Sequence, residues 1–561
     1  MQTIRTHGVV FVLLVLLASP IYGQEKKEPA QRDVVVPAQT ETPLPKIDLP
    51  EFLITGQETI DLPVSSKTIV EEEKVYVPGS LSPGSKDAQF DEGPKQLKEI
   101  AGPAGQMNGK VLAGIGAYTT PFMEGWFGKN YEEGGILFHA GYESSNGHVA
   151  NANWQKTGVG LQGDYRSPQT SGVLAESRLS GGLNFSGQSY RAYGSTTPSQ
   201  LRTLDDMRLE LGLTPAPATM VFFDNPIDYS GSLSWNGTSL DDSSNASEND
   251  LGVTISGTTE KGGARFRGTM DYVASGVSMR YPPNIAGHSP QWFALRFSAQ
   301  QMIVPQLQGT LTLQQFIYRG NLSVTGGRFY PALDLRYFLN DALNLFLSFS
   351  PSVEQNTLLT VVAADRYVRN GMDLRPTEMP ASVEIGSEVL VNEKLRAKGT
   401  LSYRSFRDYP VFVELTSAKV WDVMYLQKAS AVQFDLEGSY HLSSSNSAWL
   451  SASLNSTKAE GSANQVPNLP AFSVSGVYRQ ALQNGVDLEG HVRYSSQRWT
   501  TISHTSANAG YIDVGGKGEY QVTEDLRAVL ELDNLMNQRY YLWDGYVERP
   551  FFVSLGVSYK W

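Results

Sequence analysis

The residues of this chain that could carry out chemistry are few and widely spaced. Its 561 residues include no cysteine, which excludes thiolate metal sites and cysteine nucleophiles. The seven histidines show no HExxH motif and no repeated ligand spacing; they are His7, His139, His148, His288, His441, His491 and His504. A membrane hydrolase would need a histidine to meet a serine and an acidic residue in space. The sequence leaves this minor alternative open for His441 and His491.

Two further motifs have simpler interpretations. Gly158, Gly160 and Gly163 match a dinucleotide-binding pattern, but they lie in an expected strand that no helix follows, which favours glycines packed under bulky neighbours. The acidic residues between Asp241 and Asp250 could hold Ca²⁺ or bridge divalent cations on lipopolysaccharide, although a solvated loop is favoured. The sequence therefore predicts no catalytic residue, no metal ligand and no cofactor, and we expect no enzyme.

Composition excludes two other classes of protein. The formal net charge is −12, which argues against a nucleic-acid-binding protein. Aromatic residues make up 11% of the chain and hydrophobic residues 40%, which excludes a wholly disordered chain.

The N-terminal region has two parts with different composition. Residues 1–23 combine Arg5, an apolar run over 9–18 and a small-residue zone, which together are typical of a secretory signal peptide. Prolines then recur between charged residues over 24–108. Such a segment cannot bury a core, and we interpret it as an extended periplasmic arm.

From residue 109 to the end, apolar and polar residues alternate with a period of two. The last strand is the clearest case, with apolar residues at every second position: Phe551, Val553, Leu555, Val557, Tyr559 and Trp561. Runs of about ten to fourteen residues recur, the length of a tilted strand that crosses a bilayer. Many intervening residues are charged, and a dry core could not hold them. The pattern predicts strands with one face toward lipid and the other toward a wet lumen.

Connections alternate between short turns and long polar loops, such as 356–380 and 537–549. This alternation is typical of the periplasmic and extracellular ends of a barrel. We therefore predict an all-β fold: a transmembrane antiparallel up-and-down β-barrel over 109–561, with about 20 strands (18–22), in the bacterial outer membrane. Residues 190–227 break the alternation and are interpreted as an atypical insert, with a helix over 203–212 or an unrecognised hairpin.

The C-terminal segment carries a recognisable set of motifs. It contains Asn534, Leu535, Asn537, Tyr540, Tyr541, Gly545, Tyr546, Pro550 and a final aromatic, Trp561. This resembles the close of TonB-dependent outer-membrane receptor barrels. Further back, Pro376 and Glu378 followed by Glu384 and Gly386 are similar to another region of that family. The resemblance covers roughly 325–561.

The resemblance implies further features nearer the N-terminus and at the C-terminus. Glu58, Thr59, Ile60, Asp61 and Leu62 look like a TonB box, a short strand that pairs with the TonB energy-coupling protein. We expect the globular plug that such receptors carry to be missing or vestigial in this chain. At the other end, Val557, Tyr559 and Trp561 resemble the signal that the barrel-assembly machinery recognises.

The leading hypothesis is a TonB-dependent receptor-like barrel that takes up a nutrient across the outer membrane. It would contact outer-membrane lipid and lipopolysaccharide, the barrel-assembly machinery and the TonB protein, but no nucleic acid. A passive diffusion porin and a non-transporting scaffold or surface-binding barrel are the alternatives.

Overall fold

A computed structural model describes residues 107–561, except for 169–175, 216–219, 223–224, 243–244, 280–289, 320–324, 341, 393, 415, 417, 444 and 483–484. The signal peptide and the Pro-rich arm, including the TonB box predicted over 58–62, lie outside the described residues.

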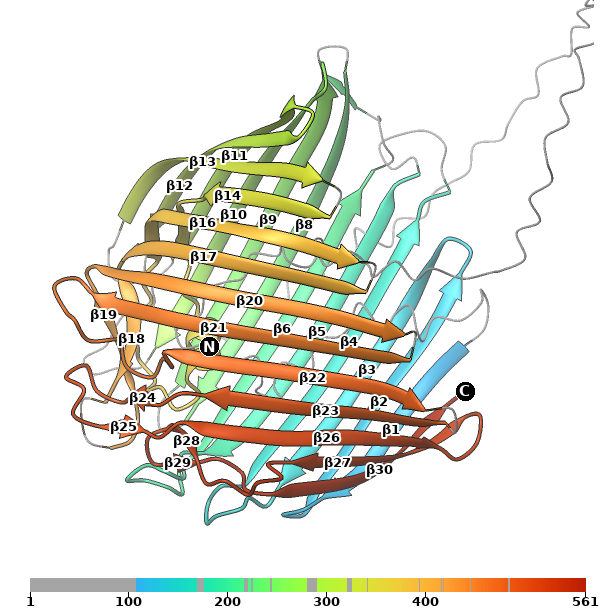
Figure 1. The fold of residues 1–561 in the computed structure, drawn as a ribbon, viewed down its shortest axis with the longest axis vertical. Helices are drawn as coiled ribbons and strands as arrows, with labels where there is room; N and C mark the ends of the chain where they lie inside the picture. The colour runs from blue at the N-terminus through green and yellow to red at the C-terminus, as the bar shows by residue number, and fades with distance from the viewer. Residues whose placement is uncertain are drawn as a thin grey trace, which may run out of the picture. The chain divides into compact units, whose positions relative to one another are not determined.

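Twenty-two antiparallel strands form one closed barrel, drawn in Figure 1. They are β1 (Met107–Gly116), β2 (Thr120–Tyr131), β3 (Gly134–Ser145), β4 (Trp154–Arg166), β5 (Arg178–Arg191), β6 (Leu201–Thr214), β8 (Asn225–Asp241), β9 (Asn245–Lys261), β10 (Ala264–Met279), β11 (Gln291–Val304), β12 (Leu307–Arg319), β13 (Thr325–Asn340), β14 (Leu343–Phe349), β16 (Thr377–Asn392), β17 (Leu395–Arg407), β20 (Ala429–Ser443), β21 (Asn446–Ala459), β22 (Phe472–Leu482), β23 (Val486–Ser495), β26 (Tyr511–Gln521), β27 (Leu526–Asp533) and β30 (Phe552–Lys560).

The remaining elements belong to the connections. Short strands β7 (Met220–Phe222) and β15 (Ser352–Glu354) pair with β8 and β16. Three small ribbons and one helix stand in long loops: β18 (Tyr409–Val413) with β19 (Asp422–Leu426), β24 (Arg498–Trp499) with β25 (Ala507–Asn508), β28 (Tyr541–Trp543) with β29 (Tyr546–Val547), and α4 (Leu358–Ala364).

The barrel closes where the first strand meets the last. β1 and β30 pair antiparallel, with Ile115 opposite Leu555 and Val111 opposite Tyr559. Each other strand pairs with its neighbours along the chain. The predicted all-β barrel of about 20 strands is confirmed.

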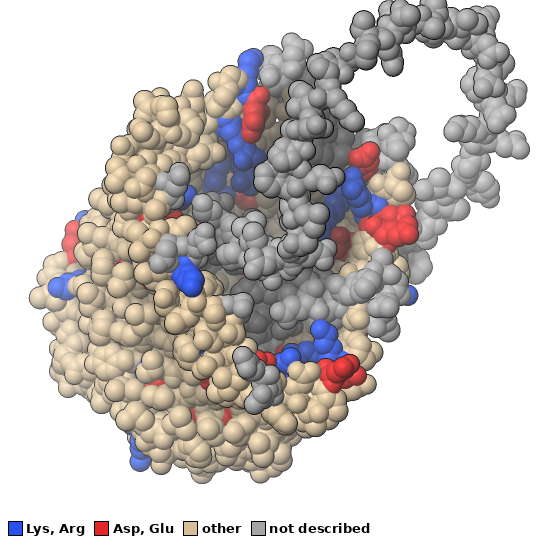
Figure 2. Space-filling view, turned by 45° about the vertical axis from the view of Figure 1, so that its right-hand side comes forward, with Lys and Arg blue, Asp and Glu red and all other residues tan. Residues whose placement is uncertain are grey.

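The outer wall is apolar, as the period-two pattern predicts. Leu555 is 61% exposed, whereas its neighbour Ser554 faces the other way and is 4% exposed. In Figure 2 the wall in view carries few charged side chains, and Lys, Arg, Asp and Glu gather inside the opening and at its edges. Exposed leucines and phenylalanines in such number are unfavourable in water but suit hydrocarbon. No helix among the described residues is long and apolar enough to cross a membrane.

The two ends of the barrel differ in their connections. One end, which we call the short-turn rim, carries the start of β1 and the end of β30. It also carries turns such as 132–133, 262–263, 305–306 and 522–525. The opposite end, the long-loop rim, carries 350–376, 408–428, 460–471, 496–510 and 534–551. The predicted alternation of short turns and long loops is found in this part of the chain.

The helix predicted over 203–212 is wrong. These residues lie within β6, which pairs with β5 and β8. Met207 and Leu211 are exposed on the outer face, while Arg208 and Glu210 alternate with them. The segment 190–227 is thus built from a long-rim loop, a full barrel strand and a short-rim connection, so it contains the hairpin that the sequence did not reveal.

Candidate functional site at the barrel mouth

One long loop folds back onto the inside of the barrel. We call residues 355–376 the strap; it connects β15 to β16 and contains α4. Its apolar side chains pack on inward-facing residues of strands β6, β8, β9 and β10, well around the wall from where the strap begins. The strap therefore extends from one part of the long-loop rim across to another.

Helix α4 is fixed at its N-terminus by three acceptors. Thr357 is the N-cap, and its side chain and that of Thr360 form a capping box. The backbone N–H of Leu358 also donates to the carboxylate of Glu248 on β9. A carboxylate at this position satisfies a free N–H and interacts favourably with the helix dipole.

The strap has an apolar core of its own. Leu358, Val361 and Val362 are at most 3% exposed and pack with Leu240 and Val277 of the wall. Spacing of i, i+3 and i+4 places the three residues on one face of a helix. A helix of seven residues is marginal on its own, so α4 depends on this packing for its stability.

Arg202, on the inward face of β6, ties the strap to the wall. It is 2% exposed, and its guanidinium donates to the carbonyl oxygen of Val368 at 2.5 Å and to that of Arg366 at 3.0 Å. Asp242 lies 3.5 Å from its Nε. Since a buried guanidinium that loses its acceptors is strongly destabilising, Arg202 favours the packed position of the strap.

Aromatic side chains join the strap to three other loops. Tyr367 of the strap stacks on Tyr546 at a centroid distance of 3.6 Å, and Tyr193 meets Tyr546 edge-on at 5.1 Å. Trp421 lies 5.8 Å from the same ring. The loops 192–200, 408–428 and 534–551 therefore share one buried cluster with the strap.

An ion-pair group links two of these loops. Lys419 donates to Asp544 at 2.5 Å and to Glu414 at 3.3 Å. Nearby, a Cβ on Gly194 would lie 2.5 Å from the carbonyl oxygen of Gly545. This close approach of two backbones explains why both positions are glycine.

The strap also buries one carboxyl group, that of Asp365. It is 1% exposed, and its Oδ1 accepts from the backbone N–H of Tyr367 at 2.8 Å. Its Oδ2 has no hydrogen-bond partner. Burial raises the pKa of Asp365 to about 7, against the smaller opposing effects of the Tyr367 N–H and of Arg202 and Arg366.

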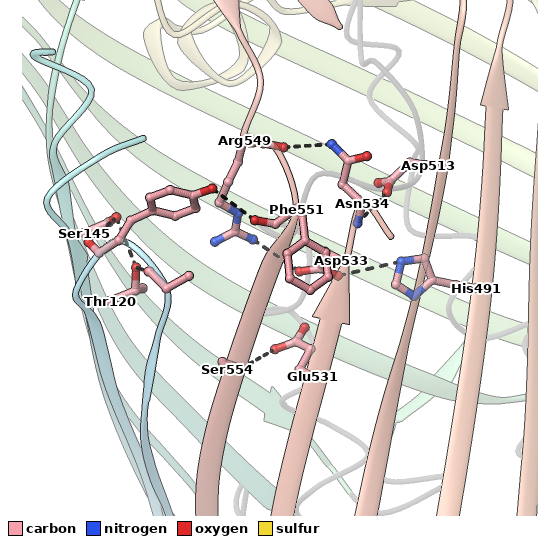
Figure 3. A network of polar contacts seen from close by, with 12 residues as sticks. Thr120, Ser145, His491, Asp513, Glu531, Asp533, Asn534, Arg549, Phe551 and Ser554 are labelled. Atoms are coloured by element: carbon pink, nitrogen blue, oxygen red, sulfur yellow. Dashed lines mark hydrogen bonds and ion pairs between the residues drawn. The ribbon is translucent and has the colours of Figure 1, made fainter. Parts of the chain in front are cut away.

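Below the loops, charged groups form a network on the inner wall near the closing strands. Figure 3 shows His491 and Arg549 approaching Asp533 from two sides, at 3.8 and 3.3 Å. Ser554 donates to Glu531 at 3.4 Å. The network pairs its charges internally, as a wet but partly desolvated wall requires.

The asparagines of the C-terminal motif have a structural role in this network. Asn534 donates to the carbonyl oxygens of Gln538 and Arg549, and Asn537 accepts from the N–H of Phe551. Both adopt a positive φ, 45° and 50°, which asparagine tolerates better than most residues. The motif thus fixes the turn that leaves β27.

The second motif of the resemblance centres on Glu378. This side chain is buried and accepts from Tyr318, from Arg328 at 2.9 Å and from Arg407 at 3.5 Å. It joins β12, β13 and β17 to the first residues of β16. The buried carboxylate thus connects the end of the strap to the wall.

The predicted assembly signal lies on the closing strand. Val557 and Tyr559 are exposed on the outer face of β30, and Trp561 follows it. The Trp561 ring stacks with Tyr559 and meets Phe127 edge-on at 5.5 Å. Backbone bonds pair Trp561 with Gly109. These contacts place the three residues at the seam, and the role as an assembly signal remains a prediction.

The minor motifs of the sequence lie apart from one another. His441 is exposed toward the short-turn end of β20, whereas His491 meets Asp533 on the inner wall. Gly158, Gly160 and Gly163 lie within β4, as expected. The expectation of a solvated acidic loop is wrong for Glu248 and Asp250, which are buried on β9. Among the described residues no cluster of acidic or histidine side chains is arranged to hold a metal ion.

The sequence did not reveal the strap, which it presented as a polar loop over 356–380. A signal was present, because the apolar residues of α4 have helical spacing and follow a threonine cap. Arg202 was missed because a basic residue on a barrel strand ordinarily faces the lumen water.

Comparison with known proteins gives structural relatives only. No family model matches the chain, and no curated protein matches it. The FrpB iron transporter of Neisseria meningitidis is 12% identical and covers 83% of each chain, with a TM-score of 0.64. The siderophore receptor PiuA of Acinetobacter baumannii is 10% identical over 82% of each chain, with a TM-score of 0.62.

A third similar structure is the copper transporter OprC, at 12% identity and a TM-score of 0.62, covering 81% of this chain and 80% of that one. All three are transporters or receptors by description. Identities this low establish the architecture, and they agree with the resemblance read from the C-terminal motifs. The chain therefore has the fold of an outer-membrane β-barrel of the TonB-dependent receptor type.

Proposed function

We propose that this protein takes up a small ligand across the outer membrane through its barrel. The observation that carries the proposal is the strap, which is packed and hydrogen-bonded against the inner wall at the long-loop rim. A loop held inside the barrel by buried bonds suits a receptor, which must bind its ligand before it opens. The similar structures include iron and copper transporters and a siderophore receptor, which makes metal chelates the first class to test.

Energy for uptake would come through the arm. Glu58, Thr59, Ile60, Asp61 and Leu62 would pair with the TonB protein as an added strand. Lipopolysaccharide and lipid would surround the wall, and Val557, Tyr559 and Trp561 would be read by the barrel-assembly machinery.

A nutrient-limited growth assay tests uptake directly. Cells that depend on this protein would be supplied with iron chelates, copper, cobalamin or oligosaccharides as the limiting nutrient. We expect growth on at least one, and loss of that growth when residues 58–62 are deleted. A deletion of residues 38–42 in the same arm is the matched control and should leave growth unchanged. If neither deletion reduces growth, passive diffusion would be favoured.

Conductance in planar bilayers separates the alternatives. We expect the intact protein to conduct little, and Arg202→Ala to conduct more because the strap loses its buried donor. Large, steady conductance by the intact protein would favour a porin. A non-transporting scaffold would be favoured if no conductance is measured for the intact protein, for Arg202→Ala or for a variant lacking residues 24–108.

A further inference from the structure

Buried donors without acceptors gather in the loop 496–510 between β23 and β26. Arg498 is 2% exposed and Asn508 is 7% exposed. Three of their nitrogen atoms, Arg498 Nε, Arg498 Nη1 and Asn508 Nδ2, are buried and have no hydrogen-bond partner. Native proteins leave few such groups unsatisfied, so each one calls for a partner.

The three nitrogens belong to side chains that project together. Arg498 and Asn508 are directly opposite each other in the β24–β25 ribbon. Opposite residues of an antiparallel pair project from the same face, with Cβ atoms about 4.5–5.5 Å apart. The unsatisfied donors therefore share one side of the ribbon.

The surroundings hold Arg498 in position but leave two of its nitrogen atoms without an acceptor. Its Nη2 donates to Ser495 Oγ at 3.0 Å, and its Cζ lies 5.7 Å from the centre of the Tyr511 ring. Tyr511 in turn stacks on Tyr540 at 4.1 Å. Tyr511 is also a side-chain hydrogen-bond partner of the guanidinium, and Glu548 attracts it electrostatically. The neighbouring loop 460–471 is held close by a bond from the Asn468 N–H to the Trp499 carbonyl oxygen.

We propose that the pair Arg498 and Asn508 binds an oxyanion, a carboxylate or phosphate group, in the loop region of the long-loop rim. A guanidinium fork matches the two oxygens of such a group, and charge-assisted hydrogen bonds are the stronger kind. An amide N–H opposite supplies a third donor. A water molecule could accept two bonds but would bring no negative charge to the buried guanidinium.

Two sources could supply this chemistry: a dissolved anion, including an anionic group of the ligand taken up, and a phosphate of lipopolysaccharide. The site does not depend on the proposed uptake, since binding can be measured without transport.

Calorimetric titration of the purified full-length protein tests the site. The probes are inorganic phosphate and acetate in detergent, and lipopolysaccharide added to the protein in phosphatidylcholine vesicles. We expect saturable binding of at least one probe. Arg498→Gln should weaken it more than about tenfold, because a charge-assisted pair of bonds is lost. Arg539→Gln, in another long-rim loop, is the control and should bind as the unmodified protein does.

Asn508→Asp gives a second and opposite test. A carboxylate placed across the ribbon from Arg498 would supply the missing acceptor, so anion binding should disappear while the thermal unfolding temperature rises. Binding of free phosphate or acetate would identify a dissolved anion, and binding of lipopolysaccharide alone would identify its phosphate; both support the site. No binding of any probe, or binding that survives Arg498→Gln and Asn508→Asp, would overturn the proposal, whatever the result of the growth assay.

Discussion

Two buried groups decide whether the strap stays on the wall. Arg202 donates hydrogen bonds to the strap backbone. The buried carboxyl group of Asp365 accepts one hydrogen bond, from the Tyr367 N–H, and its other oxygen has no partner. Neither role could be predicted from the sequence, since that of Arg202 depends on contacts more than 160 positions away and that of Asp365 on its burial in the packed strap. The asparagines at 534 and 537 are different, because their motif was recognised and the structure supplies its physical reason, a pair of left-handed turn residues.

Asp365 should make the strap sensitive to pH. Its pKa is raised to about 7 in the packed strap, compared with about 3.9 for an ordinary aspartate. The packed state therefore retains a proton that the released state has lost, and the stability of packing falls as pH rises from about 4 through 7. The hydrogen-exchange protection factors of residues 355–376, which correct for the intrinsic pH dependence of exchange, should fall between pH 5 and pH 8, while those of the strand amides serve as an internal reference.

Asp365→Asn should remove most of this dependence, because the amide oxygen can still accept from Tyr367 and carries no charge. The strap of this variant should keep high protection factors at both pH values. If the variant keeps the pH dependence of the unmodified protein, another group controls the strap.

At the scale of the element, period-two alternation predicted a barrel of about 20 strands, close to the 22 that form it, and it failed in β6, where charged residues interrupt the pattern. In β6, Asp205 and Asp206 stand side by side between a threonine and a glycine, which imitates a capped helix. Pairing with β5 and β8 overrides that local preference. The helix of the strap was not predicted for a different reason. Its seven residues are too few for a helical pattern to stand out from the long loop around them.

The two faces of β8 should respond oppositely to a charge. Leu233 is 37% exposed on the outer face, and its neighbour Ser232 is exposed on the inner face. Arginine at a lipid-facing position near the bilayer midplane costs about 2–4 kcal/mol. Leu233→Arg should therefore lower recovery of folded barrel, seen as loss of heat-modifiable migration, whereas Ser232→Arg should fold normally. Equal effects of the two changes would show that this face of β8 does not meet lipid.

The end of β30 should govern the rate of assembly more than the stability of the finished barrel. The Trp561 ring packs on Tyr559 and Phe127, and its backbone pairs with Gly109, so these contacts lie at the seam. Trp561→Ala should slow insertion in a pulse-chase assay, and Trp561→Phe should restore most of the rate. Both variants should show unfolding temperatures close to that of the unmodified protein. A large loss of stability with a normal insertion rate would assign Trp561 a purely structural role.

For the whole molecule, the arrangement of the rims predicts its orientation. Both ends of the barrel sheet lie at the short-turn rim, and the arm leads into β1 there. If the arm meets TonB, this rim must face the periplasm and the long-loop rim, with the strap and the proposed oxyanion site, must face outside.

Because the chain has no cysteine, single cysteine substitutions can report this orientation without background labelling. Ser503 and Glu133 are exposed at the long-loop and short-turn rims respectively. A membrane-impermeant maleimide should label Ser503→Cys on intact cells, and should label Glu133→Cys only after the outer membrane is opened. The reverse labelling would show that the long-loop rim faces the periplasm. A ligand that arrives from outside would then not meet the strap first.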